Sequence, residues 1–129
     1  MKIDSTNSSP IFVQIAEGIE DGILSGAFPE DTRIPSTTEI SSLYKINPAT
    51  ALKGINLLVS EGFIYKKRGL GMFVTLGAVK MIKKKRQDTF VSDFISPLIK
   101  EALRLDISST ELLSILENHL RKDDNNELY

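Results

Sequence analysis

The sequence predicts a mainly α-helical protein with a small β-hairpin, because three signals adjoin one another in it. Two short helical patterns, each with its own start signal, lie within residues 36–61. The turn between them is so short that the helices must cross steeply. A two-stranded pattern with a glycine-rich tip follows directly. Together these signals predict a winged helix-turn-helix, followed by a two-helix C-terminal dimerisation segment.

The first predicted helix is scaffold. It follows the polar residues 1–8, with Ser9 as its cap and Pro10 at its first position, where the missing N–H is harmless. Its outer face is acidic and would repel the phosphate backbone of a nucleic acid. An isoleucine recurs every fourth residue and gives the helix one apolar stripe for the core. The stripe consists of Ile11, Ile15, Ile19 and Ile23.

The two helices of the central motif carry local start signals. Ser36 and Glu39 have the spacing of a capping box, in which each side chain accepts a hydrogen bond from the other residue's backbone N–H. Asn47 is the expected cap of the second helix, and Pro48 takes its first position. The apolar spacing places this recognition helix at 48–61, where a glycine ends it.

A hairpin is predicted next, with an apolar-to-basic strand at 63–67 and a returning strand at 72–75. Glycines in the turn permit the positive φ that a tight hairpin needs. Basic residues at the tip suit contact with phosphates or a minor groove, so the wing is placed at 66–72. A short strand at 33–35 is expected to pair with it.

Beyond residue 76 the sequence reads as one long, interrupted helix over 78–105. Pro97 interrupts it, because a proline inside a helix removes a hydrogen bond and clashes with a carbonyl, which costs about 3 kcal/mol or more. A kink is preferred, since the apolar positions continue in phase, and a new helix capped by Ser96 is the alternative. Ser108 begins the last helix, which a polar tail from Arg121 follows.

Three parts are therefore expected: a winged-helix domain at 9–76, a helical dimerisation segment at 77–121 and a mobile tail at 122–129. Residues 90–120 hold more large apolar side chains than two helices can bury against each other, and such surfaces usually face a partner. A two-fold homodimer through 90–120 is the expected solution. The alternative is that these helices fold back on the winged helix of their own chain.

Composition fits a small globular protein of 129 residues with 41% hydrophobic residues and no cysteine. No disulfide or thiolate metal site is expected, and a reducing cytoplasm is the simplest location. No apolar run approaches a membrane span, and the first five residues do not resemble a signal peptide.

The net charge of −1 conceals a segregation of charge. Residues 1–31 hold one basic and six acidic residues, whereas residues 32–75 hold six basic and two acidic ones. A basic excess in the segment proposed to read DNA is the expected electrostatic footprint. The basic run at 83–86, with Lys80 before it, either grazes phosphates or is a solvated linker face.

Catalysis is not expected. His119 is the only histidine and is interpreted as a structural or surface residue. No nucleophile–base set, paired-carboxylate motif, metal-ligand cluster or nucleotide-binding loop stands out, so no cofactor or metal is expected.

The sequence resembles GntR-type transcriptional regulators, and specifically their short YtrA-like branch. The resemblance covers roughly residues 8–120 and implies a DNA-binding transcriptional regulator, a repressor by preference, that binds a palindromic operator in double-stranded DNA as a homodimer. The matching segments are 10–15 (PIFVQI), 23–26 (ILSG), 31–36 (DTRIPS), 47–50 (NPAT), 61–64 (EGFI), 68–74 (RGLGMFV), 101–105 (EALRL) and 111–113 (ELL).

The resemblance also implies where DNA contacts lie: at the starts of the second and third helices and at the wing tip. Asn47 and Thr50 are the expected base-edge readers, with Ala49 offering a methyl group to thymine. Arg33 and Lys53 would neutralise phosphates. The matching positions are Arg33, Ser36, Thr37, Thr38, Asn47, Ala49, Thr50, Lys53, Lys67, Arg68 and Gly69.

Two positions depart from the family. Many relatives have an arginine where Thr38 stands and a basic residue where Leu52 stands, so this protein is expected to read fewer bases directly or to prefer another operator.

The alternative function is a winged-helix protein–protein interaction module without direct DNA reading. About 50 residues follow the wing, too few for a large ligand pocket in one chain, and a small effector at a dimer interface stays open.

Overall fold

The computed structural model describes residues 3–4, 6 and 8–126. Contacts within the chain divide it into two compact units, Met1–Arg86 and Gln87–Tyr129. The first predicted domain ended at residue 76, whereas the first unit of the structure includes Ala78 and Ile82, which lie buried in its core. Within the described residues no helix is both long and apolar enough to cross a membrane.

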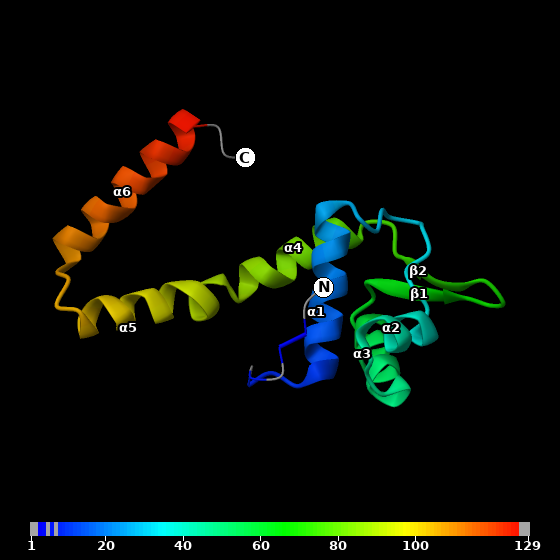
Figure 1. Ribbon diagram of the computed structural model, residues 1–129. Coiled ribbons are helices and arrows are strands. Elements are labelled where there is room, and N and C mark those ends of the chain that lie inside the picture. The colour runs from blue at the N-terminus through cyan, green and yellow to red at the C-terminus, as the bar shows by residue number, and fades with distance from the viewer. Residues whose placement is uncertain (1–2, 5, 7, 127–129) are drawn as a thin grey trace. The chain divides into compact units, whose positions relative to one another are not determined.

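The predicted fold class is correct: the chain is mostly helical, with one antiparallel two-stranded hairpin (Figure 1). The central motif has the predicted order, and α3 ends one residue before the predicted end of the recognition helix. The elements are α1 (Ile11–Ser25), α2 (Thr37–Tyr44), α3 (Pro48–Ser60), β1 (Ile64–Lys67), β2 (Gly71–Val74), α4 (Ala78–Asp88), the π-helix η1 (Val91–Ile95), α5 (Ser96–Arg104) and α6 (Ser109–Asn126).

The prediction for the start of the first helix was wrong by one residue. Pro10 is the N-cap, with φ −57° and ψ 150°, and Ile11 is the first helical residue. Pro10 is extended, and its carbonyl accepts hydrogen bonds from the N–H groups of Val13 and Gln14. The carbonyl of Ser9, the expected cap, accepts a hydrogen bond from the Gln14 side chain at 3.0 Å.

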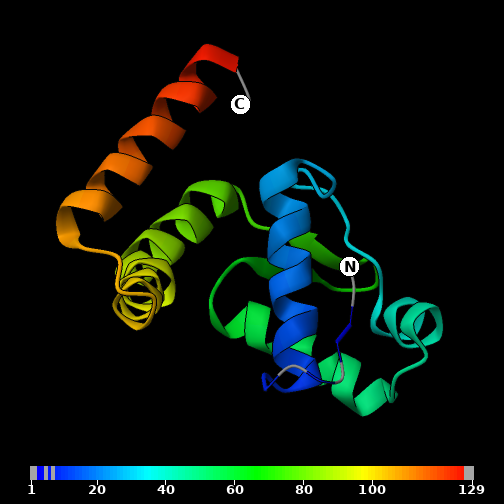
Figure 2. The same ribbon diagram turned by 60° about the vertical axis from the view of Figure 1, so that its left-hand side comes forward.

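The core of the first unit forms where α1 lies against α3 (Figures 1 and 2). Gly54 of α3 makes this close approach possible, since a Cβ there would lie 2.8 Å from the carbonyl oxygen of Phe12. Leu57 of α3 is partly buried and also packs against this core. Three of the four predicted isoleucines are buried, and Ile11 is exposed.

The predicted caps of α2 and α3 are both present. The Ser36 hydroxyl accepts from the Glu39 N–H, and Glu39 accepts from the Ser36 N–H, each at 3.1 Å. The Asn47 side chain accepts from the Ala49 N–H at 2.8 Å. These bonds satisfy backbone donors that a helix start leaves without partners, so they fix the start of each helix.

The hairpin pairs Ile64 with Val74 and Lys67 with Gly71. The predicted strand at 33–35 is reduced to a single antiparallel bridge between Arg33 and Phe73. That bridge, together with the hydrogen bond from the Ile34 N–H to the Met72 carbonyl, ties the segment before α2 to the wing.

A buried carboxylate, that of Glu20, holds the last turn of α4 against α1. The Glu20 side chain is 2% exposed and pairs with Lys85 at 2.9 Å and with Arg86 at 3.3 Å. Lys85 also pairs with Glu61, and Arg86 with Asp21. Burial lowers the pKa of Lys85, but the hydrogen bonds and negative charges of Glu61 and Glu20 together outweigh burial and leave the pKa raised. These two members of the basic run therefore make structural ion pairs, which neither interpretation of the run foresaw.

In the second unit the chain stays helical across Pro97. Residues 91–95 form π-helical turns, and the N–H of Ser96 donates to the carbonyl of Val91. Ser96 makes no side-chain cap and is itself the first residue of α5, so the alternative of a newly capped helix is wrong. The wider turns lie just before the proline, where a regular helix would meet its ring.

The last helix begins as predicted and ends later. The Ser108 hydroxyl accepts from the Glu111 N–H at 3.1 Å. α6 continues to Asn126, beyond the predicted start of the tail, and residues 127–129 lie outside the described residues. Most large apolar side chains of this unit are exposed, among them Phe90, Val91, Phe94, Ile99, Leu103, Leu105, Leu113 and Leu120.

Acid is expected to destabilise the first unit through two carboxylates. The Ser36 N–H, the Ser36 hydroxyl and Arg33 hold the pKa of Glu39 below its ordinary 4.5. The N–H groups of Gly77 and Val79, at the start of α4, likewise lower the pKa of Glu30. A lowered carboxyl pKa stabilises the folded state above the ordinary pKa, and this contribution is lost as the pH falls through the lowered value.

The measurement is the free energy of unfolding in urea at neutral pH and at successive values below 4.5. Glutamine at both Glu30 and Glu39 keeps a hydrogen-bond acceptor but cannot titrate, so the double variant should show a shallower loss in acid. Equal slopes for the two proteins would mean that other groups set the acid limit.

Candidate nucleic-acid interface

One surface groove brings together the start of α2, the exposed side of α3 and the wing. Its volume is about 590 Å³. Arg33 and Lys66 supply positive charge, and the first residues of α2 supply hydroxyl groups. The lining residues are Arg33, Ser36, Thr37, Thr38, Leu52, Ile55, Asn56, Val59, Lys66, Leu70, Gly71 and Met72.

The predicted residues at the start of α2 all line this groove. Arg33 forms an ion pair with Glu39, so the capping box also orients the guanidinium. Thr37 and Thr38 stand in the first turn of the helix, where backbone N–H groups have no intrahelical acceptor and the helix dipole favours anions. Such backbone N–H groups and hydroxyls are chemically suited to contact a phosphate group.

The predicted residues at the start of α3 lie outside the groove lining. The Asn47 side-chain oxygen is engaged as a cap, which leaves its amide N–H groups for other contacts. Ala49 is exposed and Thr50 half-buried. The Lys53 ammonium lies 4.3 Å from the centre of the Phe12 ring, so its side chain packs against α1.

Strand alternation separates the two lysines of the wing. Lys66 pairs with Met72 across the hairpin, and both line the groove. Lys67, the predicted contact, lies 4.2 Å from the Phe73 ring centre and 3.8 Å from an Asp31 oxygen. Arg68 and Gly69 form the exposed tip, which points away from the helices (Figure 1).

Eight lining residues were not among the predicted contacts, and five of these have exposed side chains: Leu52, Asn56, Val59, Lys66 and Leu70. The period-2 alternation of β1 was a signal for Lys66, since it shares a strand face with the buried Ile64. Helical spacing was a signal for Asn56, which stands four residues after Leu52. No local signal placed Leu70 beside them, because that depends on the hairpin folding against α3.

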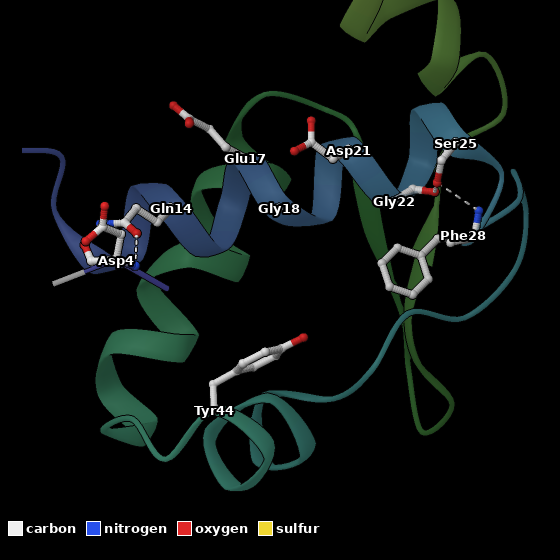
Figure 3. Close-up of a pocket in the computed structure, with 10 residues that line it drawn as sticks. Asp4, Gln14, Glu17, Gly18, Asp21, Gly22, Ser25, Phe28 and Tyr44 are labelled. Atoms are coloured by element: carbon white, nitrogen blue, oxygen red, sulfur yellow. Dashed lines mark hydrogen bonds between the residues drawn. The ribbon is translucent and has the colours of Figure 1, made fainter. Parts of the chain in front are cut away.

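A second cavity, of about 570 Å³, lies along α1 and is unsuited to DNA. Figure 3 shows the rings of Phe28 and Tyr44 at its edges. Asp4, Glu17 and Asp21 give it a negative lining that would repel phosphates. Among the described residues no cluster of three or more histidine or acidic side chains is placed to hold a metal ion.

The fold and the groove define the class of protein as a winged helix-turn-helix. The family model described as bacterial regulatory proteins of the gntR family matches residues 12–74. The chain is 32% identical to a solved Bacteroides thetaiotaomicron protein described as belonging to that family, with a TM-score of 0.70 over 88% of this chain and 99% of that one. The chain belongs to the GntR family.

Two further comparisons bear on function. The transcriptional repressor YtrA of Bacillus subtilis is 28% identical over 79% of this chain and 78% of its own length. The DNA-binding domain of AraR, solved with its operator ORR3, is 31% identical, with a TM-score of 0.51 over 58% of this chain and 90% of that one. Against the longer relatives YurK and NagR, the chain spans only 30% and 31% of their length.

Proposed function

We propose that this protein is a transcriptional repressor that binds a palindromic operator as a homodimer. The recognition helix α3 enters the major groove, and the wing contacts the flanking backbone. The observation that carries the proposal is the convergence of the α2 N-terminus, Arg33 and Lys66 on the exposed side of α3. Backbone N–H groups, hydroxyls and cations are the groups that hold DNA phosphates and set the register of a reading helix.

The relatives support this proposal. AraR was solved on an operator, and YtrA is named a repressor. The predicted contacts at Asn47, Ala49, Thr50, Lys53, Lys67, Arg68 and Gly69 remain part of the proposal. The groove adds Lys66 to them and gives Arg33 a fixed orientation.

A homodimer is proposed because the second unit leaves its apolar residues unburied. Phe90 and Phe94 are 51% and 65% exposed, and Leu103 is 71% exposed. Two-fold symmetry would cover the same face on both chains and would set two reading helices about 34–36 Å apart on successive turns of DNA. We therefore assign DNA binding to the winged helix and dimerisation to residues 90–120.

The experiment begins with selection of duplexes from a randomised pool by the purified chain. Affinity for the selected duplex is then measured by fluorescence anisotropy between 50 and 200 mM salt. A palindromic consensus and a steep salt dependence would support the proposal, because each neutralised phosphate releases counterions. Retention of no sequence, or binding that salt leaves unchanged, would favour the protein-interaction module.

The two lysines of the wing give a sharper prediction. We expect Lys66→Ala to weaken binding about tenfold at low salt and to reduce the slope of affinity against salt by roughly one per protomer. Lys67→Ala should have the smaller effect, because the Lys67 ammonium lies between Phe73 and Asp31. Comparable losses for both variants, or a larger one for Lys67→Ala, would show that strand alternation does not select the phosphate-contacting lysine.

A further inference from the structure

The floor of the groove is apolar apart from one amide. Leu52, Asn56 and Val59 stand on one face of α3 at spacings of four and three residues, so their side chains form a stripe. Leu52 is 48% exposed and Val59 is 40% exposed. The Asn56 side chain is exposed and makes no hydrogen bond to the described part of the chain. The stripe is thus open to a ligand.

The surroundings of the stripe fit DNA. Arg33 and Lys66 line the groove together with the hydroxyl-bearing residues Ser36, Thr37 and Thr38 at the start of α2. A duplex whose phosphates meet these groups would lay its base edges against the stripe between them. The positive charge of Arg33 and Lys66 therefore favours a nucleic acid over an apolar peptide.

The chemistry of the stripe selects one kind of base pair. The thymine methyl is the one apolar group that bases present in the major groove, and adenine presents the donor and acceptor that an asparagine amide can bond together. Guanine or cytosine against Leu52 would leave polar base atoms without water or a partner, which is unfavourable. Guanine is read best by arginine or lysine, and neither stands on this stripe.

Resting on the proposed function, we propose that this stripe is a specificity element for A·T pairs. Asn56 donates to N7 and accepts from the N6 amino group of one adenine. Leu52, with Val59 beside it, packs on the methyl group of a neighbouring thymine. The protein thereby replaces charged base reading at this part of the helix with recognition of methyl groups.

The test removes single atoms or groups from the DNA. In the selected duplex each thymine is replaced in turn by deoxyuridine, which lacks only the methyl group, and each adenine by 7-deazaadenine, which lacks N7. We expect one or two deoxyuridine positions in each half-site to weaken binding about fourfold, the effect of burying one methyl group. One 7-deazaadenine position should weaken it by about tenfold.

Variants connect each effect to its residue. Leu52→Ala should abolish the deoxyuridine effect, and Asn56→Ala the 7-deazaadenine effect, because the contact is already lost. Ser60→Ala is the matched control, since Ser60 is exposed on the same helix, lies outside the groove lining and is not a proposed contact, so it should leave both effects intact. Circular dichroism of each variant verifies that the helices are retained.

The outcomes separate this inference from the proposed function. A selected duplex that binds tightly but responds to no deoxyuridine, or responds equally in Leu52→Ala, overturns methyl recognition and leaves the repressor proposal standing. Selection of G·C pairs at the positions that Leu52→Ala or Asn56→Ala alters would overturn it as well. Selection of no sequence would overturn both proposals together.

Discussion

Phe94→Asp is expected to convert the proposed dimer to a monomer and to weaken operator binding by a factor of roughly 100 to 10,000. Phe94 is 65% exposed in the second unit, and its ring centre lies 5.7 Å from that of Phe90. A carboxylate there would have to be desolvated at the apolar interface without a partner. The affinity for DNA falls because each monomer then binds one half-site alone, whereas a dimer binds both half-sites at once.

Sedimentation velocity at micromolar concentration measures the association state, and anisotropy on the selected duplex measures affinity. Ser92→Asp is the control, since it adds the same charge within the same π-helical segment at an exposed polar position. We expect the control to remain dimeric. A wild-type chain that sediments as a monomer, or a Phe94→Asp variant that stays dimeric, would contradict the proposed interface.

Gly54→Ala is expected to lower the free energy of unfolding by about 2 kcal/mol and the Tm by roughly 10 °C. In a helix interior alanine is favoured over glycine by about 1 kcal/mol. A loss of stability would therefore show that the clash with α1 outweighs this preference. The added Cβ would lie 2.8 Å from the Phe12 carbonyl oxygen and 3.0 Å from the Ile15 Cγ2. Because one of these atoms is backbone, α1 itself must move and the core between α1 and α3 must open.

Gly22→Ala is the matched comparison, because it makes the same change in a helix of the same core. Its Cβ would lie 2.5 Å from two carbons of the Phe28 ring, which belong to a half-buried side chain that can rotate away. We expect a change within about 1 kcal/mol, measured by urea unfolding. If Gly22→Ala lowered the free energy of unfolding more than Gly54→Ala does, the Phe28 ring would be held more firmly than the α1 backbone.

The helix starts of the central motif could be predicted because their causes are local. The Ser36–Glu39 box and the Asn47 cap involve residues at most three apart, so their spacing in the sequence is also their spacing in the helix. The hairpin was predictable for the same reason. The starts of α1 and α5 were harder, because a proline beside a serine leaves two positions for the cap.

The candidate site was predictable by segment and less so by residue. The wing was placed correctly in the chain, but which of its lysines lines the groove depends on the hairpin register and the bridge to Arg33. The basic run looked like a surface feature, yet Lys85 and Arg86 meet Glu20, 65 and 66 residues away. No spacing within a helix reveals such a partner.

The sequence by itself determined the order, type and starts of the central elements, because capping and periodicity act over a few residues. Tertiary structure alone decided the groove: it set Lys66 beside Leu52 and Asn56 and turned Lys53 toward Phe12. It also decided that Gly54 must remain without a side chain. The physical reason is that packing brings distant residues together, and which side chains meet depends on how whole elements lie against one another.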